Sequence, residues 1–178
     1  DLISDARRDL SRDADLGLGM IIRQKNAVLD IEVLSFDLVS VIASPGSDRD
    51  IALQELDEVL VFSLVTSDLT DADADADADA DASRDALLAP VLAKLRSQAR
   101  QNEPVAIVSV SGAVRAGGNY PLIRGATVET LINAAGGLTD SAFLQAAELR
   151  RLSDRKSGEV VADYRDINLA QGAGLELA

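Results

Sequence analysis

The sequence contains no cysteine and no histidine. Without these side chains there can be no disulfide, no thiolate nucleophile, no Cys/His zinc site and no imidazole base, so Ser-His-Asp catalysis is also excluded. Tryptophan is absent as well, and aromatic residues make up only 3% of the chain. Since the apolar fraction is still 47%, the core must be built from alanine, valine, isoleucine and leucine.

Acidic residues outnumber basic ones, with 30 Asp and Glu against 17 Lys and Arg, which gives a formal net charge of −13. A chain of this charge repels the phosphates of nucleic acids and anionic lipid headgroups, so we expect no nucleic-acid partner. No segment approaches the roughly 18 consecutive apolar residues that a membrane-spanning helix needs. The first residues also lack the basic and apolar stretches of a secretory leader.

With 178 residues, the chain has room for one domain of ordinary size or two small ones. Residues 1–18 are rich in Asp and Arg, and we expect a lead-in segment that is helical only if it packs. Residues 19–66 carry strand and turn signals. The predicted elements there are a strand around 31–35, a helix over 38–43 capped by Asp37, and a strand over 59–62.

Residues 67–83 contain a run of aspartates that alternate with alanines from Asp71 to Asp81. Repulsion between the carboxylates predicts an expanded, flexible acidic linker. A calcium loop of the EF-hand type also begins with Asp at alternate positions. Its turn glycine would fall at Ala76 and its bidentate acid at Ala82, so the spacing fails and no metal site is predicted.

Residues 84–103 are predicted to form a connecting helix, because apolar residues recur at helical spacing from Leu88 to Leu95. Ser83 is a candidate N-cap. Pro90 either starts the regular part of this helix or kinks it.

Residues 104–178 give the clearest pattern of strands, turns and one short helix. The predicted elements are a strand over 105–110, a strand–glycine turn–strand unit over 112–122, a helix over 128–135 capped by Thr127 and ended by Gly136 and Gly137, and a hairpin from 148–152 to 160–161.

An internal repeat relates Ile31–Leu53 to Val160–Leu177. Each copy has a β-rich run, an aromatic residue, an aspartate beside an apolar residue, a gap with glycine and an apolar-x-Leu ending. The first copy continues into the strand at 59–62, whereas the second has no equivalent. The sequence therefore predicts the rear half of one module over 19–66 and a second module over 104–178 that lacks its last strand. The strand at 59–62 could complete the second module, either in the same chain or by domain swapping with a neighbour.

Three motifs carry a resemblance to a known family. They are Val-Ser-Val-Ser-Gly-Ala-Val-Arg at 108–115, Gly-Asn-Tyr-Pro-Leu at 118–122, and the segment 125–139 with its Ala-Gly-Gly-Leu-Thr ending. Together they make the sequence resemble the SLBB family, the soluble-ligand-binding β-grasp domain, over nearly all of 105–177. The resemblance implies an α+β β-grasp fold, a mixed sheet wrapped around one short helix. One departure is the turn Gly117-Gly118, where the family usually has Pro-Gly.

The helix around Pro90 looks like the one between tandem SLBB domains in outer-membrane polysaccharide export proteins. This resemblance implies a noncatalytic structural and binding module of a bacterial outer-membrane-associated protein, located in the periplasm, for capsule or exopolysaccharide transport. It implies no cofactor. It also implies as partners further copies of the chain in a ring, the polysaccharide, and an inner-membrane export or copolymerase component. The alternatives are binding of a small soluble ligand such as a cobalamin, or assembly in another envelope complex. A glycosidase with two carboxylates has no specific support, because 30 acids make some pair inevitable.

Candidate contact residues flank the glycine turn. Arg115, Asn119 and Tyr120 could touch a sugar chain or a neighbouring subunit, because Tyr can stack its ring and Arg can donate to hydroxyls or carboxylates. The alternative is a tyrosine packed on the sheet and an arginine in solvent. No Lys and Ser/Thr follow the glycines, so a phosphate-binding loop is excluded. The predicted turn glycines are Gly112, Gly117, Gly118, Gly136 and Gly137.

Overall fold

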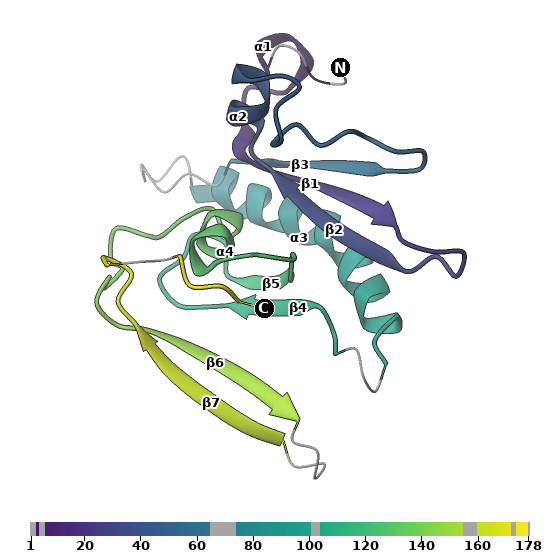
Figure 1. Ribbon diagram of the computed structural model, residues 1–178. Coiled ribbons are helices and arrows are strands. Elements are labelled where there is room, and N and C mark those ends of the chain that lie inside the picture. The colour runs from purple at the N-terminus through teal and green to yellow at the C-terminus, as the bar shows by residue number, and fades with distance from the viewer. Residues whose placement is uncertain are drawn as a thin grey trace.

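The structure is a computed structural model that describes residues 3, 6–64, 74–100, 104–154, 160–171 and 174–177. It confirms the α+β class (Figure 1). The strands described form three antiparallel sheets with orders β2-β1-β3, β4-β5 and β6-β7, so the expected mixed sheet is not observed among them. In chain order the elements are α1 (Ala6–Asp9), β1 (Ala14–Gln24), β2 (Ile31–Phe36), α2 (Leu38–Ala43), β3 (Glu58–Ser63), α3 (Ala74–Ser97), β4 (Ile107–Val110), β5 (Gly118–Pro121), α4 (Val128–Ala134), β6 (Ala147–Asp154) and β7 (Val160–Ile167).

The central strand of the first sheet is β1, which presents apolar residues on both faces. Met20 belongs to the main core, whereas Ile21 is 2% exposed on the opposite face. This strand starts at Ala14, so the prediction that 1–18 is only a lead-in segment is wrong for its last five residues. The polar Asp15 hid the pattern, because its carboxylate is buried in an ion pair with Arg84, 69 positions away.

Helix α3 corrects two predicted boundaries. It begins at Ala74, so residues 74–83 are helical rather than a flexible linker, and Ser83 lies inside the helix; the predicted linker residues 67–73 lie outside the described part. Alanine has the highest helix propensity, so the alternating alanines favour a helix over this segment. The helix runs through Pro90 and ends at Ser97, short of the predicted 103.

The strands, the short helix and the hairpin predicted for the second half are observed, with somewhat different boundaries. Helix α4 begins at its N-cap Thr127, whose hydroxyl accepts a hydrogen bond from the Thr130 amide at 3.2 Å. Its C-terminal end is followed by Gly136 and Gly137, with φ of 73° and 91°. After β7 the chain turns at 168–171, and the last described residues return to the start of α4, where the Leu177 amide donates to the Ala126 carbonyl at 2.8 Å.

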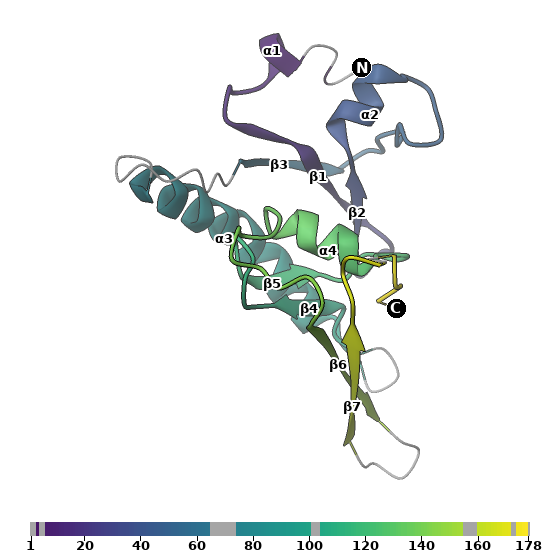
Figure 2. The same ribbon diagram turned by 90° about the vertical axis from the view of Figure 1, so that its left-hand side faces the viewer.

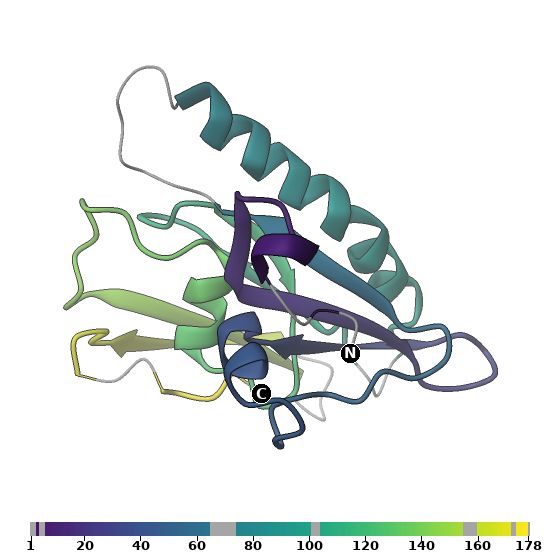
Figure 3. The same ribbon diagram turned by 90° about the horizontal axis from the view of Figure 1, so that it is seen from above.

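The two predicted modules share one core. A single cluster of buried residues combines Met20 and Phe62 of the first sheet with Leu88 of α3 and with Tyr120 and Ala135 of the second half. Helix α4 lies between the β2-β1-β3 sheet and the β4-β5 hairpin (Figure 2), and α3 runs along one side of the molecule (Figure 3). The chain therefore folds around a continuous interior and not as two modules joined by a spacer.

Two consequences follow for the predicted repeat. Strand β3 pairs with β1, so the strand at 59–62 does not complete the second module in its own chain, and that expectation is wrong. Asp37 caps α2, whereas its predicted counterpart Asp166 lies within β7, and a turn follows instead of a helix. In the part of the chain described, no helix is both long and apolar enough to cross a membrane.

Candidate functional site

The site that the sequence points to lies where the 111–117 loop meets the end of α4. The two segments are joined by backbone hydrogen bonds. The Arg115 amide donates to the Gly137 carbonyl at 3.1 Å, and the Ala116 amide donates to the Ala135 carbonyl at 2.8 Å. The Thr139 amide donates back to the Ala113 carbonyl at 3.1 Å. The loop is thus held as an irregular strand against the glycine-rich end of the helix.

Glycine conformations decide how this loop is shaped. Gly112, Gly136 and Gly137 have φ of 98°, 73° and 91°, in the left-handed region that side chains disfavour. Gly117 and Gly118 do not, and Gly118 is the first residue of β5. Of the five predicted turn glycines, Gly117 and Gly118 therefore do not use the left-handed conformation. Between β4 and β5, the residue with positive φ is Gly112, which follows the end of β4.

Tyr120 is buried, with 3% of its surface exposed. Its hydroxyl donates to the Ala116 carbonyl at 2.6 Å and so ties the 111–117 loop to β5. The ring cannot stack on a sugar in this structure. Tyr120 instead packs on the sheet, which was the alternative expectation for this residue.

Arg115 is half-buried rather than in solvent. Its Nη1 lies 3.4 Å from the Gly136 carbonyl, and its Nε is buried without a hydrogen-bond partner. The guanidinium therefore covers the carbonyl-bearing end of α4, where the helix dipole favours positive charge.

Asn119 is exposed, and adjacent residues of a strand point to opposite faces, so it faces away from Tyr120. The three predicted contact residues consequently do not converge on one ligand. Arg115 and Asn119 remain candidate contacts, and Tyr120 supports the loop.

Sequence reasoning missed the support beneath this site. Arg84 is 1% exposed; its Nη2 pairs with Asp15 at 3.0 Å and donates to the Ser63 carbonyl at 3.0 Å. Its Nη1 donates to the carbonyl of Ala134, the last residue of α4. The sequence does indicate that Arg84 is buried, because Arg84 precedes Leu88 by four residues and so lies on the apolar face of its helix.

Among the residues described, no group of three or more acidic side chains is arranged to hold a metal ion.

Part of the chain is similar to a known protein family. Residues 107–172 match the family model of the SLBB domain, so the match begins with β4 and continues just past β7. No curated protein and no solved structure matches the chain. The matched residues lie within the predicted second module and include Arg115, Asn119, Tyr120 and the five predicted turn glycines. Residues 107–172, the SLBB segment, are thus similar to the SLBB domain, a family of ligand-binding modules.

Proposed function

We propose that this chain is a noncatalytic SLBB module of an outer-membrane polysaccharide export protein. In this proposal it lies in the periplasm and assembles with further copies of itself and with an inner-membrane copolymerase component around the exported polysaccharide. The observation that carries the proposal is the β6-β7 hairpin of the SLBB segment, which extends away from the rest of the chain (Figures 1 and 2).

This hairpin is built as a surface for a neighbour. Strands β6 and β7 pair with each other over eight residue pairs and with no other described strand. A hairpin of two strands alone is only marginally stable in water, and each outer edge presents unpaired backbone donors and acceptors. A second copy that packs on the hairpin would stabilise it and would pair the free backbone donors and acceptors of its edges.

The charges of the hairpin favour contact between copies. Its described, exposed ionisable side chains carry equal numbers of both signs, whereas the whole chain carries −13. Copies that repel each other elsewhere can therefore meet here at low electrostatic cost. The residues are Glu148, Arg150, Arg151, Asp163, Arg165 and Asp166.

The strongly acidic remainder fits a wall along which an acidic polymer moves. A surface of the same sign repels an anionic polysaccharide and keeps it from adhering in transit. A neutral exported polymer would remove this reason for the charge.

Charge reversal tests the assembly. Arg150→Glu with Arg165→Glu removes two positive charges from the hairpin and adds two negative ones. Arg151 is left unchanged because it also donates to the Leu177 carbonyl. The matched control makes the same change at the exposed Arg12 and Arg96, outside the hairpin. Sedimentation velocity on the full chain should show oligomers for the parent and the control, and monomers for the hairpin variant.

Identical sedimentation of the two variants would contradict assembly through the hairpin. Binding of cobalamin by the full chain, together with a monomeric parent, would favour the small-ligand alternative implied by the SLBB family.

A further inference from the structure

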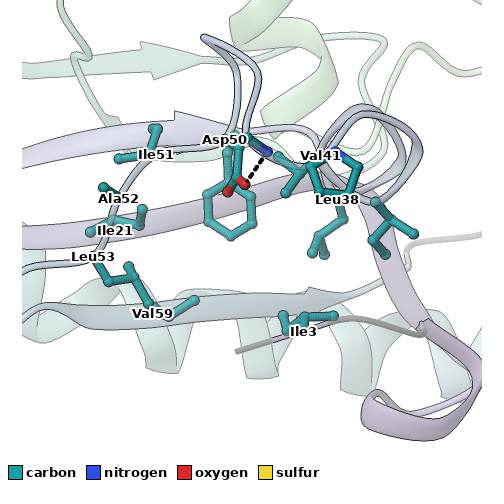
Figure 4. Close-up of a pocket in the computed structure, with 13 residues that line it drawn as sticks. Ile3, Ile21, Leu38, Val41, Asp50, Ile51, Ala52, Leu53 and Val59 are labelled. Atoms are coloured by element: carbon teal, nitrogen blue, oxygen red, sulfur yellow. Dashed lines mark hydrogen bonds between the residues drawn. The ribbon is translucent and has the colours of Figure 1, made fainter. Parts of the chain in front are cut away.

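A pocket lies outside the SLBB segment, on the first sheet of the molecule. The face of the β2-β1-β3 sheet that is turned away from α3 holds a pocket of about 480 Å³ under α2 and the following loop (Figure 4). Pockets that hold small ligands are typically about 300–1,000 Å³. Of its 13 lining residues, 11 are apolar, and the other two are Gly46 and Asp50.

The floor and one wall of this pocket are fixed by local structure. The Phe36 ring lies directly on Gly19, so closely that a methyl group at Gly19 would overlap the ring. Helix α2 is anchored by Asp37, whose carboxylate accepts hydrogen bonds from the Val39 amide at 2.9 Å and the Ser40 amide at 3.3 Å.

The opposite wall is the loop before β3, and it is held from outside the pocket. Arg23 donates to both carboxylate oxygens of Asp57, at 3.0 and 2.6 Å, and to the Ala52 carbonyl at 2.9 Å. The hydrogen bond from Arg23 lowers the pKa of Asp57 below its ordinary value, so the pair is charged at neutral pH. Neither Arg23 nor Asp57 lines the pocket, so this ion pair holds the lining residue Ala52 without occupying the pocket itself.

The polar group of the pocket is a carboxylate. Asp50 accepts a hydrogen bond from the Gly46 amide at 2.8 Å, and no other ionisable residue lines this pocket. The adjoining hollow beyond Phe36 is lined by Asp37, Asp48 and Arg49, so it adds two carboxylates and one guanidinium. The local charge is therefore negative and complements a cation.

We propose that this pocket binds a small amphipathic molecule with an aliphatic body and an ammonium group, independently of the SLBB segment. The aliphatic body would contact residues such as Ile21, Leu38, Ile51 and Val59, and the ammonium group would lie beside Asp50. An anionic amphiphile of the same length would bind less well, because its headgroup would face the carboxylate.

Displacement of a fluorescent probe tests this ligand class. The full chain is loaded with the neutral probe N-phenyl-1-naphthylamine, and dodecylamine, dodecanol and dodecanoate are titrated below their micelle-forming concentrations. We expect dodecylamine to displace the probe at a concentration about fivefold or more below that of dodecanol, and dodecanoate to be weakest. Equal displacement by the amine and the alcohol would overturn the proposal.

Two pairs of variants locate the site. Leu53→Trp fills the rim of the pocket, and Leu64→Trp is its control, because both leucines are 46% exposed and only Leu53 lines the pocket. Asp50→Asn removes the charge but keeps an acceptor for Gly46, and Glu55→Gln is its control.

The proposal requires that Leu53→Trp abolish probe binding and that Asp50→Asn remove the preference for the amine, while both controls behave as the parent does. Unchanged probe binding in Leu53→Trp, or the same loss of amine preference in Glu55→Gln, would overturn it. Probe binding that disappears as the chain oligomerises would also overturn it, since a second copy would then occupy the pocket.

Discussion

The buried guanidinium of Arg84 gives the sharpest prediction of stability. It lies over the Phe62 ring, 5.0 Å from its centroid, and its Nη2 pairs with Asp15 at 3.0 Å. The two side chains are 1% and 9% exposed, so water cannot replace either partner. Through Ala134 the same guanidinium also touches α4 of the SLBB segment.

The perturbation is Arg84→Met, which keeps an unbranched side chain and removes the charge. It leaves the Asp15 carboxylate buried without its partner, and breaking a buried pair in this way costs about 3–5 kcal/mol. We expect the free energy of unfolding in urea to fall by about this amount. The control is Arg96→Met on the same helix, an exposed position where the change should stay within about 0.5 kcal/mol.

The double variant Asp15→Leu/Arg84→Met separates the ion pair from packing. Removal of both charges should recover about 1 kcal/mol or more of the loss, because no charge is then buried alone. Since the core is shared, the parent should unfold in one transition. A loss below about 1 kcal/mol for Arg84→Met, or separate transitions for the two halves, would refute the reasoning.

Three further predictions concern single side chains. Gly19→Ala forces a methyl group into the aromatic ring packed on it and should cost about 1–3 kcal/mol in urea unfolding, whereas an unchanged midpoint would contradict the contact. Tyr120→Phe removes the hydrogen bond to the Ala116 carbonyl and should lower stability by about 1 kcal/mol, with a loss near zero counting against its role beneath the loop. Because Arg23 lowers the pKa of Asp57, the pair stabilises the fold above the ordinary aspartate pKa of about 4, and this stability is lost as the pH falls through the lower folded pKa. Asp57→Asn should therefore flatten the dependence of the urea midpoint on pH below about 4, and an unchanged slope would contradict the assignment.

Local patterns were sufficient to predict the short elements. Asp37 and Thr127 cap α2 and α4 as expected, because a cap acts within three residues of its own position. The apolar alternation around Ile31 and the positions of Gly136 and Gly137 likewise depend on neighbours in sequence. These features explain why the short elements could be predicted from local sequence, whereas the α+β class was implied by the resemblance to the SLBB family.

The remaining features depend on contacts that sequence spacing does not show. The start of β1 was missed because Asp15 is paired with a residue in a distant helix. In the Asp-Ala segment, repulsion between carboxylates predicts a linker, but residues 74–83 are helical, as the helix propensity of alanine favours. Tyr120 looked like a surface contact because its hydroxyl partner, the Ala116 carbonyl, becomes evident only when the loop folds back.

We propose that the SLBB segment serves polysaccharide export through contacts of its hairpin. The most direct test introduces Arg150→Glu with Arg165→Glu into the full-length protein in cells, and surface polysaccharide is quantified after an immunoblot confirms normal protein level and outer-membrane association. The matched Arg12→Glu/Arg96→Glu protein is measured beside it. We expect loss of surface polysaccharide for the hairpin variant alone. Normal polysaccharide in that variant would contradict it.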